Sequence, residues 1–131
     1  MPILIDTDVA IHLRDGDPDI TRRLDASGRT PIISAVTMVE LLGGVAVDQS
    51  AGRVRARLLT ELLRFVPVMP FTDAEAQAYG EIVAHLGHDR RRVLDRMIAA
   101  QAIVAGLPLA TINGRDFADV PGLVLEVWAA I

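Results

Sequence analysis

Short, largely apolar runs alternate along this chain with longer segments that carry apolar residues at helical spacing. The runs lie at residues 3–5, 31–33, 65–68, 107–112 and about 123–127. A strand that is apolar on both faces is normally buried on both faces, as in a parallel sheet covered by helices. The repeated strand–helix order therefore predicts an α/β fold with a parallel sheet between helical layers.

The segments between these runs are predicted as helices, at about 7–13, 18–26, 36–47, 52–63, 72–86 and 94–105. Thr72 and Glu75 have the spacing of a capping box at the start of one helix. Gly28 and Gly106 follow the ends of two others. Residues 87–92 are expected to form a polar loop. A chain of 131 residues predicts one domain over 1–131.

The composition excludes several kinds of chemistry. Cysteine is absent, so disulfides, thiol catalysis and cysteine-based zinc sites are ruled out, and all 13 basic residues are arginine. The formal charge of −4 does not suit a protein that holds nucleic acid by bulk electrostatics. No apolar run approaches the ~18 residues of a membrane span, and the first residues lack the basic region of a signal peptide. A cytoplasmic protein is expected.

Two acids follow apolar runs closely. Asp6 comes directly after residues 3–5, and Asp116 lies just beyond the turn that ends residues 107–112. Ligands of open parallel sheets bind at the carboxyl edge, near the point where the strand order reverses. Each acid also has a purely structural interpretation, which is a helix cap at Asp6 or Thr7 and a turn acid at Asp116.

A third acid lies within a predicted helix. Glu40 is the only charge in residues 36–47, which are apolar nearly all round and are therefore expected to be buried. Gly43 and Gly44 share its side of the helix and leave room beside it. Thr37 and Glu40 also fit a capping box, so a helix-capping role stays open.

Asp95 opens the helix predicted at 94–105, on a face that continues through small apolar residues. The helix dipole alone also favours an acid at that position. The four acids Asp6, Glu40, Asp95 and Asp116 can converge at one edge of a parallel sheet. Clustered carboxylates without His or Cys are hard oxygen ligands that suit Mg²⁺ or Mn²⁺ and not zinc. The sequence therefore predicts a divalent-metal site able to activate water for in-line displacement at phosphorus.

These segments resemble the PIN-domain ribonucleases, and especially the VapC-type toxins of bacterial toxin–antitoxin pairs. The resemblance covers nearly the whole chain and is carried by residues 5–9, 33–45, 94–100, 109–117 and 120–123. It places the family's first acid on Asp6, its helix glutamate on Glu40, its third acid on Asp95 and its more variable fourth acid on Asp116.

The resemblance implies a five-stranded parallel sheet in the order 3-2-1-4-5, with Asp6 and Asp116 at the switch between the first and fourth strands. It also implies an endoribonuclease that cleaves RNA phosphodiesters with Mg²⁺ or Mn²⁺. The implied partners are a second copy of the chain, as a homodimer, and a small VapB-type antitoxin that wraps the toxin and binds operator DNA.

The chain departs from the family pattern at two places. Asp8 stands where the family usually has Ser or Asn, and it either joins the metal site or caps the helix that follows. The family often has an aromatic residue and Gly soon after the helix glutamate, whereas this chain has Gly43 and Gly44. The second departure concerns contacts with substrate or antitoxin and leaves the metal ligands unchanged.

Two other functions compete with this interpretation. Asp6 and Asp8 after a strand also resemble the nucleophile motif of haloacid dehalogenase-type phosphatases. Those enzymes usually need a downstream lysine, and the chain has none. The non-enzymatic alternative is a binding module or degenerate nuclease, which would be signalled by loss of one of the four acids.

The arginines form two groups near these segments. Arg53 and Arg57 lie one turn apart on a predicted helix, and Arg90, Arg91 and Arg92 lead into the helix of Asp95. They are either a solvated face or a rim that guides phosphate toward an acidic site. The spacing of the three histidines assigns no role to His12, His85 or His88.

Overall fold

The computed structural model describes residues 1–47 and 52–128. Its centre is a five-stranded sheet in the order β3-β2-β1-β4-β5, with every neighbouring pair parallel. This confirms the α/β class and the strand order 3-2-1-4-5. The strands are β1 (Pro2–Ile5), β2 (Thr30–Ser34), β3 (Val68–Met69), β4 (Leu109–Thr111) and β5 (Leu125–Val127).

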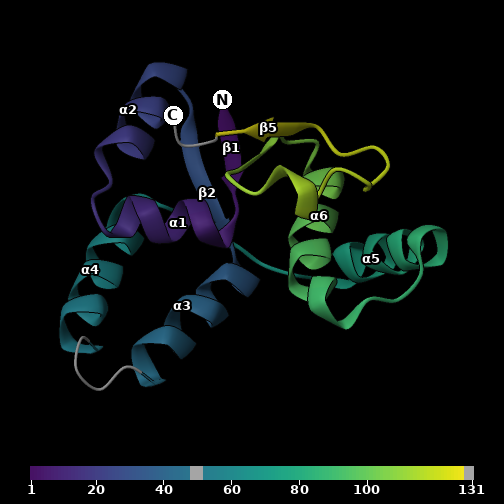
Figure 1. The fold of residues 1–131 in the computed structure, drawn as a ribbon, viewed down its shortest axis with the longest axis horizontal. Coiled ribbons are helices and arrows are strands. Elements are labelled where there is room, and N and C mark those ends of the chain that lie inside the picture. Colours follow the sequence, from purple (N-terminus) through teal and green to yellow (C-terminus); the bar gives the residue numbers. More distant parts are fainter. Residues whose placement is uncertain (48–51, 129–131) are drawn as a thin grey trace.

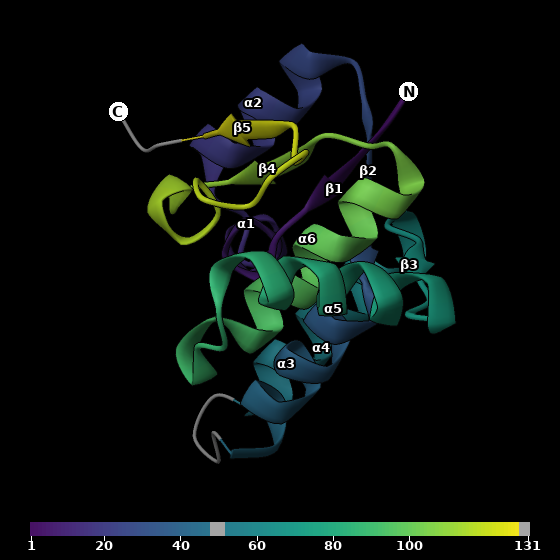
Figure 2. The ribbon, with the colours of Figure 1, turned by 90° about the vertical axis from the view of Figure 1, so that its right-hand side faces the viewer.

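Helices connect the strands and cover both faces of the sheet. In Figure 1, α1, α2 and α4 lie on one side of the strands, and α5 and α6 lie on the other. Figure 2, turned by 90°, shows α5 and α6 in front of the sheet. The helices are α1 (Thr7–Arg14), α2 (Pro18–Ser27), α3 (Ala35–Val47), α4 (Gly52–Phe65), α5 (Asp73–Leu86) and α6 (Val93–Ala105), with short 3₁₀ helices η1 (Arg90–Arg92) and η2 (Gly114–Asp116).

The sheet separates two apolar cores because successive side chains of a strand point to opposite faces. Ile3 and Ile5 of β1 belong to the core under α1, α2 and α4. Leu4, between them, belongs to the core under α5 and α6. Both faces are therefore covered, as the largely apolar strand runs predict.

The strand predicted at 65–68 is wrong in its first half. Helix α4 extends to Phe65, and the N–H of Val66 still donates to the Leu62 carbonyl at 3.0 Å. Pro67 then ends the helix because it has no N–H to donate, and only β3 pairs with β2. The apolar run is shared between a helix end and a two-residue strand.

The prediction that α3 is buried all round is also wrong. Val36, Thr37 and Leu41 are buried, but Val39 is 68% exposed and Val47 is 81% exposed. The helix packs on the rest of the chain along one stripe only. Its uniform apolarity therefore reflects an exposed apolar face and not complete burial.

Within the described residues, no helix combines the length and apolarity needed to cross a membrane.

Candidate metal centre

Asp6 lies where β1 ends and α1 begins, and its two carboxylate oxygens have different partners. Oδ1 accepts a hydrogen bond from the Val9 N–H at 2.9 Å, so Asp6 is the N-cap of α1. Oδ2 accepts a hydrogen bond from the Thr111 hydroxyl, at the end of β4, at 2.6 Å. Asp6 therefore does cap α1, as the structural interpretation expected. It also lies at the carboxyl edge of the sheet, between the neighbouring strands β1 and β4.

Glu40 reaches the same edge from α3. Its Oε1 accepts a hydrogen bond from the Thr7 hydroxyl at 2.6 Å, and the Thr7 and Thr37 hydroxyl oxygens lie 3.0 Å apart. The capping-box alternative is wrong because α3 already begins at Ala35, where Ser34 accepts the Val36 N–H. Glu40 is thus held beside the start of α1 by Thr7, the residue that follows Asp6 in the sequence.

The surroundings of Gly43 and Gly44 agree with the space predicted beside Glu40. A Cβ built at either glycine would meet nothing within 4 Å.

Asp95 lies in the first turn of α6, half-buried, above the buried residues Ile98, Ala99 and Ala102. Burial raises its pKa to about 6, with further contributions from the negative charges of four other acids. Since Coulombic effects fall with distance, these acids lie near enough to Asp95 for their charges to raise its pKa. In order of decreasing effect, the acids acting on Asp95 are Asp116, Asp6, Glu40 and Asp8.

Asp6 shows the same electrostatic pattern. Burial raises its pKa to about 6, although the hydrogen bonds from Thr111 and Val9 act in the opposite direction. The charges of Asp8 and Asp116 add to the rise. The edge of the sheet is therefore a region of concentrated negative charge in which two carboxyl groups resist ionisation.

Asp116 is carried by η2, which follows β4 through Ile112 and Asn113. The turn lies against β5, because a Cβ at Gly114 would come within 2.8 Å of Val127 Cγ2. Phe117, which directly follows Asp116, is buried and anchors this end of the turn. Asp116 therefore belongs to a turn, as the structural interpretation expected, and its charge also acts on Asp6 and Asp95.

Asp8 does not cap α1, since Asp6 does. It lies in the first helical turn, and its Oδ2 accepts a hydrogen bond from the Asn113 side-chain amide. This contact joins α1 to the turn that carries Asp116. Asp8 is therefore a fifth carboxylate at the same edge.

The donor set suits a hard divalent cation, because every charged group in it is a carboxylate. Within residues 1–47 and 52–128, however, no three acidic, histidine or cysteine side chains are grouped tightly enough to hold one ion unaided. Three of the acids are instead engaged by neighbouring side chains: Asp6 by Thr111, Glu40 by Thr7 and Asp116 by Arg92. A cation at this edge would thus be held partly through water, as Mg²⁺ commonly is.

The arginines differ in their relation to these acids. Arg92 lies 3.4 Å from Asp116, measured from Nη1 to Oδ1. Arg91 points into solvent, with 90% of its side chain exposed. Arg53 and Arg57 are exposed on α4, a helix that packs on the opposite face of the sheet from α6 (Figure 1). In these two groups of arginines, the described contact with an acid of the sheet edge is the one between Arg92 and Asp116.

A family model described as the PIN domain matches residues 3–123. The chain belongs to the PIN domain family. This confirms the resemblance stated from the sequence, and the match spans every element that carries one of the four acids.

The relatives of this PIN domain are VapC proteins. The tRNA(fMet)-specific endonuclease VapC of Shigella flexneri is 30% identical over 132 residues, covering 98% of this chain and 99% of that protein. Ribonuclease VapC1 of Rickettsia felis is 32% identical over 127 residues, covering 94% and 93%. The solved structure of DNA-bound VapBC from Salmonella typhimurium matches with a TM-score of 0.84 at 27% identity, covering 98% of this chain and 99% of that one.

Sequence reasoning missed the polar side chains that hold the acids of this PIN domain. Thr7, Thr111 and Asn113 each donate a hydrogen bond to one of the carboxylates. All three lie within two residues of a strand end, which is the signal that would have singled them out. Their hydroxyl and amide groups fix the carboxylates without neutralising their charge.

A histidine also has a partner that the sequence did not indicate. His12 Nδ1 lies 2.8 Å from Asp17 Oδ2, and Asp17 caps α2. The contact closes the turn between α1 and α2 and involves none of the acids at the sheet edge.

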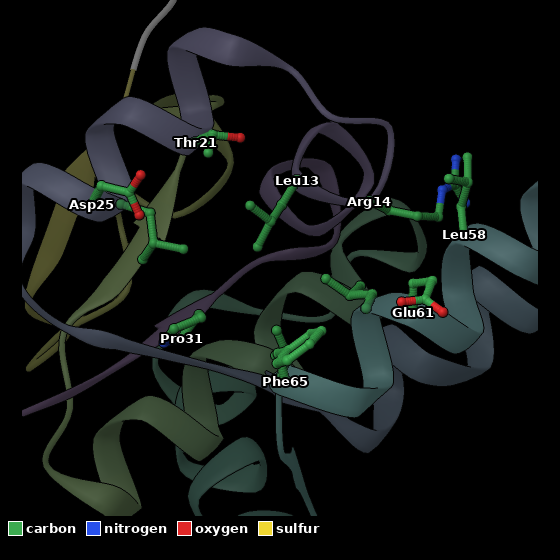
Figure 3. A pocket seen from close by; sticks show the side chains of 11 residues that line it. Leu13, Arg14, Thr21, Asp25, Pro31, Leu58, Glu61 and Phe65 are labelled. Atoms are coloured by element: carbon green, nitrogen blue, oxygen red, sulfur yellow. The ribbon is translucent and has the colours of Figure 1, made fainter.

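The PIN domain also has an apolar groove of about 500 Å³ between α1, α2 and α4. Figure 3 shows Leu13, Leu58 and Phe65 among the side chains that line it. None of the five clustered acids lines this groove. Phe65 is 77% exposed, so the groove offers a large aromatic surface to a partner.

Proposed function

We propose that this PIN domain is a metal-dependent endoribonuclease that cleaves RNA phosphodiesters. The observation that carries the proposal is the convergence of Asp6, Glu40, Asp95 and Asp116 at the carboxyl edge of the sheet. Two of these carboxyl groups have a pKa raised to about 6, which marks them as functional candidates. A cluster with this much unbalanced negative charge destabilises the fold unless a cation shares it.

The residues that would hold Mg²⁺ or Mn²⁺ are Asp6, Glu40, Asp95 and Asp116, with Asp8 beside them. When bound, the cation supplies charge stabilisation at the phosphate and a more acidic water molecule as nucleophile. Thr111 and Thr7 keep one oxygen of Asp6 and of Glu40 fixed. The remaining lone pairs of these carboxylates are then directed by the fold and do not depend on the ion for their orientation.

The relatives suggest both the substrate and the partners. Those named above are called ribonucleases or a tRNA(fMet)-specific endonuclease, so we propose RNA as the substrate. The similar solved structures contain VapBC pairs, so we propose a cognate VapB-type antitoxin, a toxin–antitoxin hetero-oligomer and a homodimer of this chain. A cytoplasmic location follows from the same proposal.

The surface offers two apolar regions for such partners. The groove between α1, α2 and α4 suits a largely apolar segment of the antitoxin, since Leu58 and Phe65 line it together with Glu61. The outer face of α3 exposes Val39 and Leu42. Exposed apolar surface of this kind marks interaction sites in soluble proteins.

The direct test is RNA cleavage by the purified chain, freed of antitoxin. Labelled RNA should be cut at internal phosphodiesters in Mg²⁺ or Mn²⁺ and remain intact in EDTA. An Asp95→Asn variant purified in parallel controls for contaminating nucleases and should be inactive. Cleavage that persists in EDTA or in the variant would contradict the proposal.

The same assay separates the competing functions. A phosphatase of the haloacid dehalogenase type would release phosphate from a phosphomonoester and leave internal linkages intact. A binding module would retain RNA without cutting it under any metal. The family match supports a nuclease. The absence of lysine argues against the phosphatase, and the presence of all four acids argues against the binding module.

A further inference from the structure

Arg92 occupies an unusual place among the arginines of the 90–92 segment. Its side chain is 31% exposed and lies between two carboxylates, Asp89 of its own loop and Asp116 of η2. Its Nη1 also lies 3.4 Å from the Arg115 carbonyl oxygen. The guanidinium of Arg92 therefore lies beside the clustered acids, next to Asp116.

The side-chain contacts of Arg92 are all long. The distances are 3.4 Å to Asp116 Oδ1 and 3.6 Å from Nε to Asp89 Oδ2, whereas a well-formed pair between a guanidinium and a carboxylate lies at about 2.7–2.9 Å. Arg29 and Glu126 of the same chain form the tight two-pronged pair for comparison. Arg92 is held near Asp116 without the geometry that would make the pair permanent.

A divalent cation and Arg92 would make competing demands on Asp116. Both are positive, and both need the carboxylate that faces the other acids. Occupation of the cluster by a cation thus weakens the attraction between Arg92 and Asp116. A released guanidinium presents up to five N–H donors in a planar fork that matches two oxygens of a phosphate.

We propose that Arg92 exchanges partners, binding Asp116 in the metal-free chain and a phosphate of RNA in the metal-loaded chain. The inference rests on the proposed function for its substrate, but the competition at Asp116 does not depend on RNA. Of the three arginines at 90–92, the proposal assigns Arg92 to the site. Arg91, which projects into solvent, is the neighbour without this role.

The proposal predicts opposite effects on metal and on RNA from one substitution. Arg92→Gln removes a positive charge from beside Asp116, so Mn²⁺ should bind the free chain about two- to fivefold more tightly. The matched control is Arg91→Gln, which makes the same change in net charge one residue away. Its Mn²⁺ affinity should equal that of wild type, because solvent and salt screen an exposed charge.

The RNA arm uses steady-state cleavage at saturating Mn²⁺. Arg92→Gln should raise KM about tenfold, as expected for loss of a charge-assisted hydrogen bond. The log–log dependence of KM on salt should also lose about 0.7, the slope of one single-stranded phosphate contact. Arg92→Lys restores the charge without the fork, so it should return Mn²⁺ affinity toward wild type and recover KM only partly.

Two results would overturn the proposal. One is Mn²⁺ affinity in Arg92→Gln that is unchanged or weaker, measured by calorimetry without RNA. The other is a KM for Arg92→Gln that matches that of Arg91→Gln. If wild type cuts no RNA at all, the proposed function fails, and the calorimetric comparison still decides whether Arg92 competes with the cation.

Discussion

Asp6 and Asp95 are the two side chains at which the fold acts most directly on chemistry. Both have a pKa of about 6 in the folded chain, against an ordinary value of 3.8. A folded-state pKa above the unfolded one means that the folded chain binds more protons between these values, so stability falls as pH rises through this window. Because a cation needs the ionised carboxylates, metal affinity should rise over the same range.

Replacing Asp95 by Asn should stabilise the metal-free chain. In EDTA at pH 7.5 we expect a gain of about 1 kcal/mol, or roughly 3 °C in Tm, allowing for the partial exposure of Asp95. The gain should shrink as pH is lowered from 7 toward 4, where wild-type Asp95 becomes protonated. A gain that does not change with pH, or a loss at pH 7.5, would show that charge repulsion is not the cause.

Glu40 is the acid whose role depends most on the contact with Thr7. Glu40→Gln keeps an oxygen to accept the Thr7 hydroxyl and removes the charge. We therefore expect the fold to persist and the rise in Tm produced by Mn²⁺ to fall well below that of wild type. Glu81→Gln on the exposed face of α5 is the control. An equal Mn²⁺-induced rise in all three proteins would exclude Glu40 from the site.

Among the elements, α6 connects the two loops that bring charge to the site. Arg96, one residue after Asp95, is 4% exposed, and its Nη1 donates to the Gly87 carbonyl at 2.7 Å. Its Nη2 lies 3.8 Å from Asp119 Oδ2. Gly87 begins the loop that carries Arg92, and Asp119 follows the turn that carries Asp116. Arg96 thus joins both loops to the helix.

Arg96→Ala should loosen this connection. Loss of the buried hydrogen bond to Gly87 should lower the free energy of unfolding by about 1–3 kcal/mol, as measured by urea denaturation. Trypsin should also cut faster after residues 90–92 in the native chain. Arg22→Ala removes an exposed arginine that pairs with Asp19 and should change stability by less than about 1 kcal/mol. Equal effects of the two variants would deny Arg96 this role.

The elements also show what sequence patterns could and could not establish. Fully apolar strands and helix-ending glycines predict the layers correctly, because burial on both faces and left-handed backbone at Gly28 and Gly106 are local requirements. The division of residues 65–68 between helix and strand depends on tertiary pairing with β2, which a local pattern does not contain. The exposure of Val39 likewise depends on how much of α3 the remaining chain covers.

At the site too, some features follow from the sequence and others depend on tertiary contacts. Asp6 and Asp116 could be placed at one edge from the strand order that the resemblance implies. The hydrogen bonds of Thr7 to Glu40 and of Asn113 to Asp8 span residues far apart in sequence. Side-chain pairs of this kind depend on rotamers and packing, so composition and spacing do not predict them.

The whole molecule separates its acidic edge from its apolar groove. A chain of net charge −4 with an acidic centre needs local positive charge or bound cations to attract RNA. The groove between α1, α2 and α4 carries an aromatic side chain and none of the five clustered acids. Partner binding at the groove and metal binding at the sheet edge should therefore be separable by mutation.

Phe65 provides the test of that separation. Phe65→Ser should weaken binding of the cognate antitoxin at least about tenfold, since exposed aromatic residues in pockets are frequent hot spots. Val54 lies on the same helix, is 62% exposed and does not line the groove, so Val54→Ser should have little effect. Mn²⁺ affinity should be unchanged in both. Equal antitoxin affinities in the two variants would place the antitoxin elsewhere.

The most direct measurement for the central claim is calorimetric titration of Mn²⁺ into the metal-free chain at pH 7.5. Wild type should bind Mn²⁺, whereas Asp6→Asn and Asp95→Asn should each bind at least about tenfold more weakly while keeping the wild-type circular dichroism spectrum. That result would support a metal centre built by the carboxylates at the sheet edge. Unchanged Mn²⁺ affinity in both folded variants would contradict it.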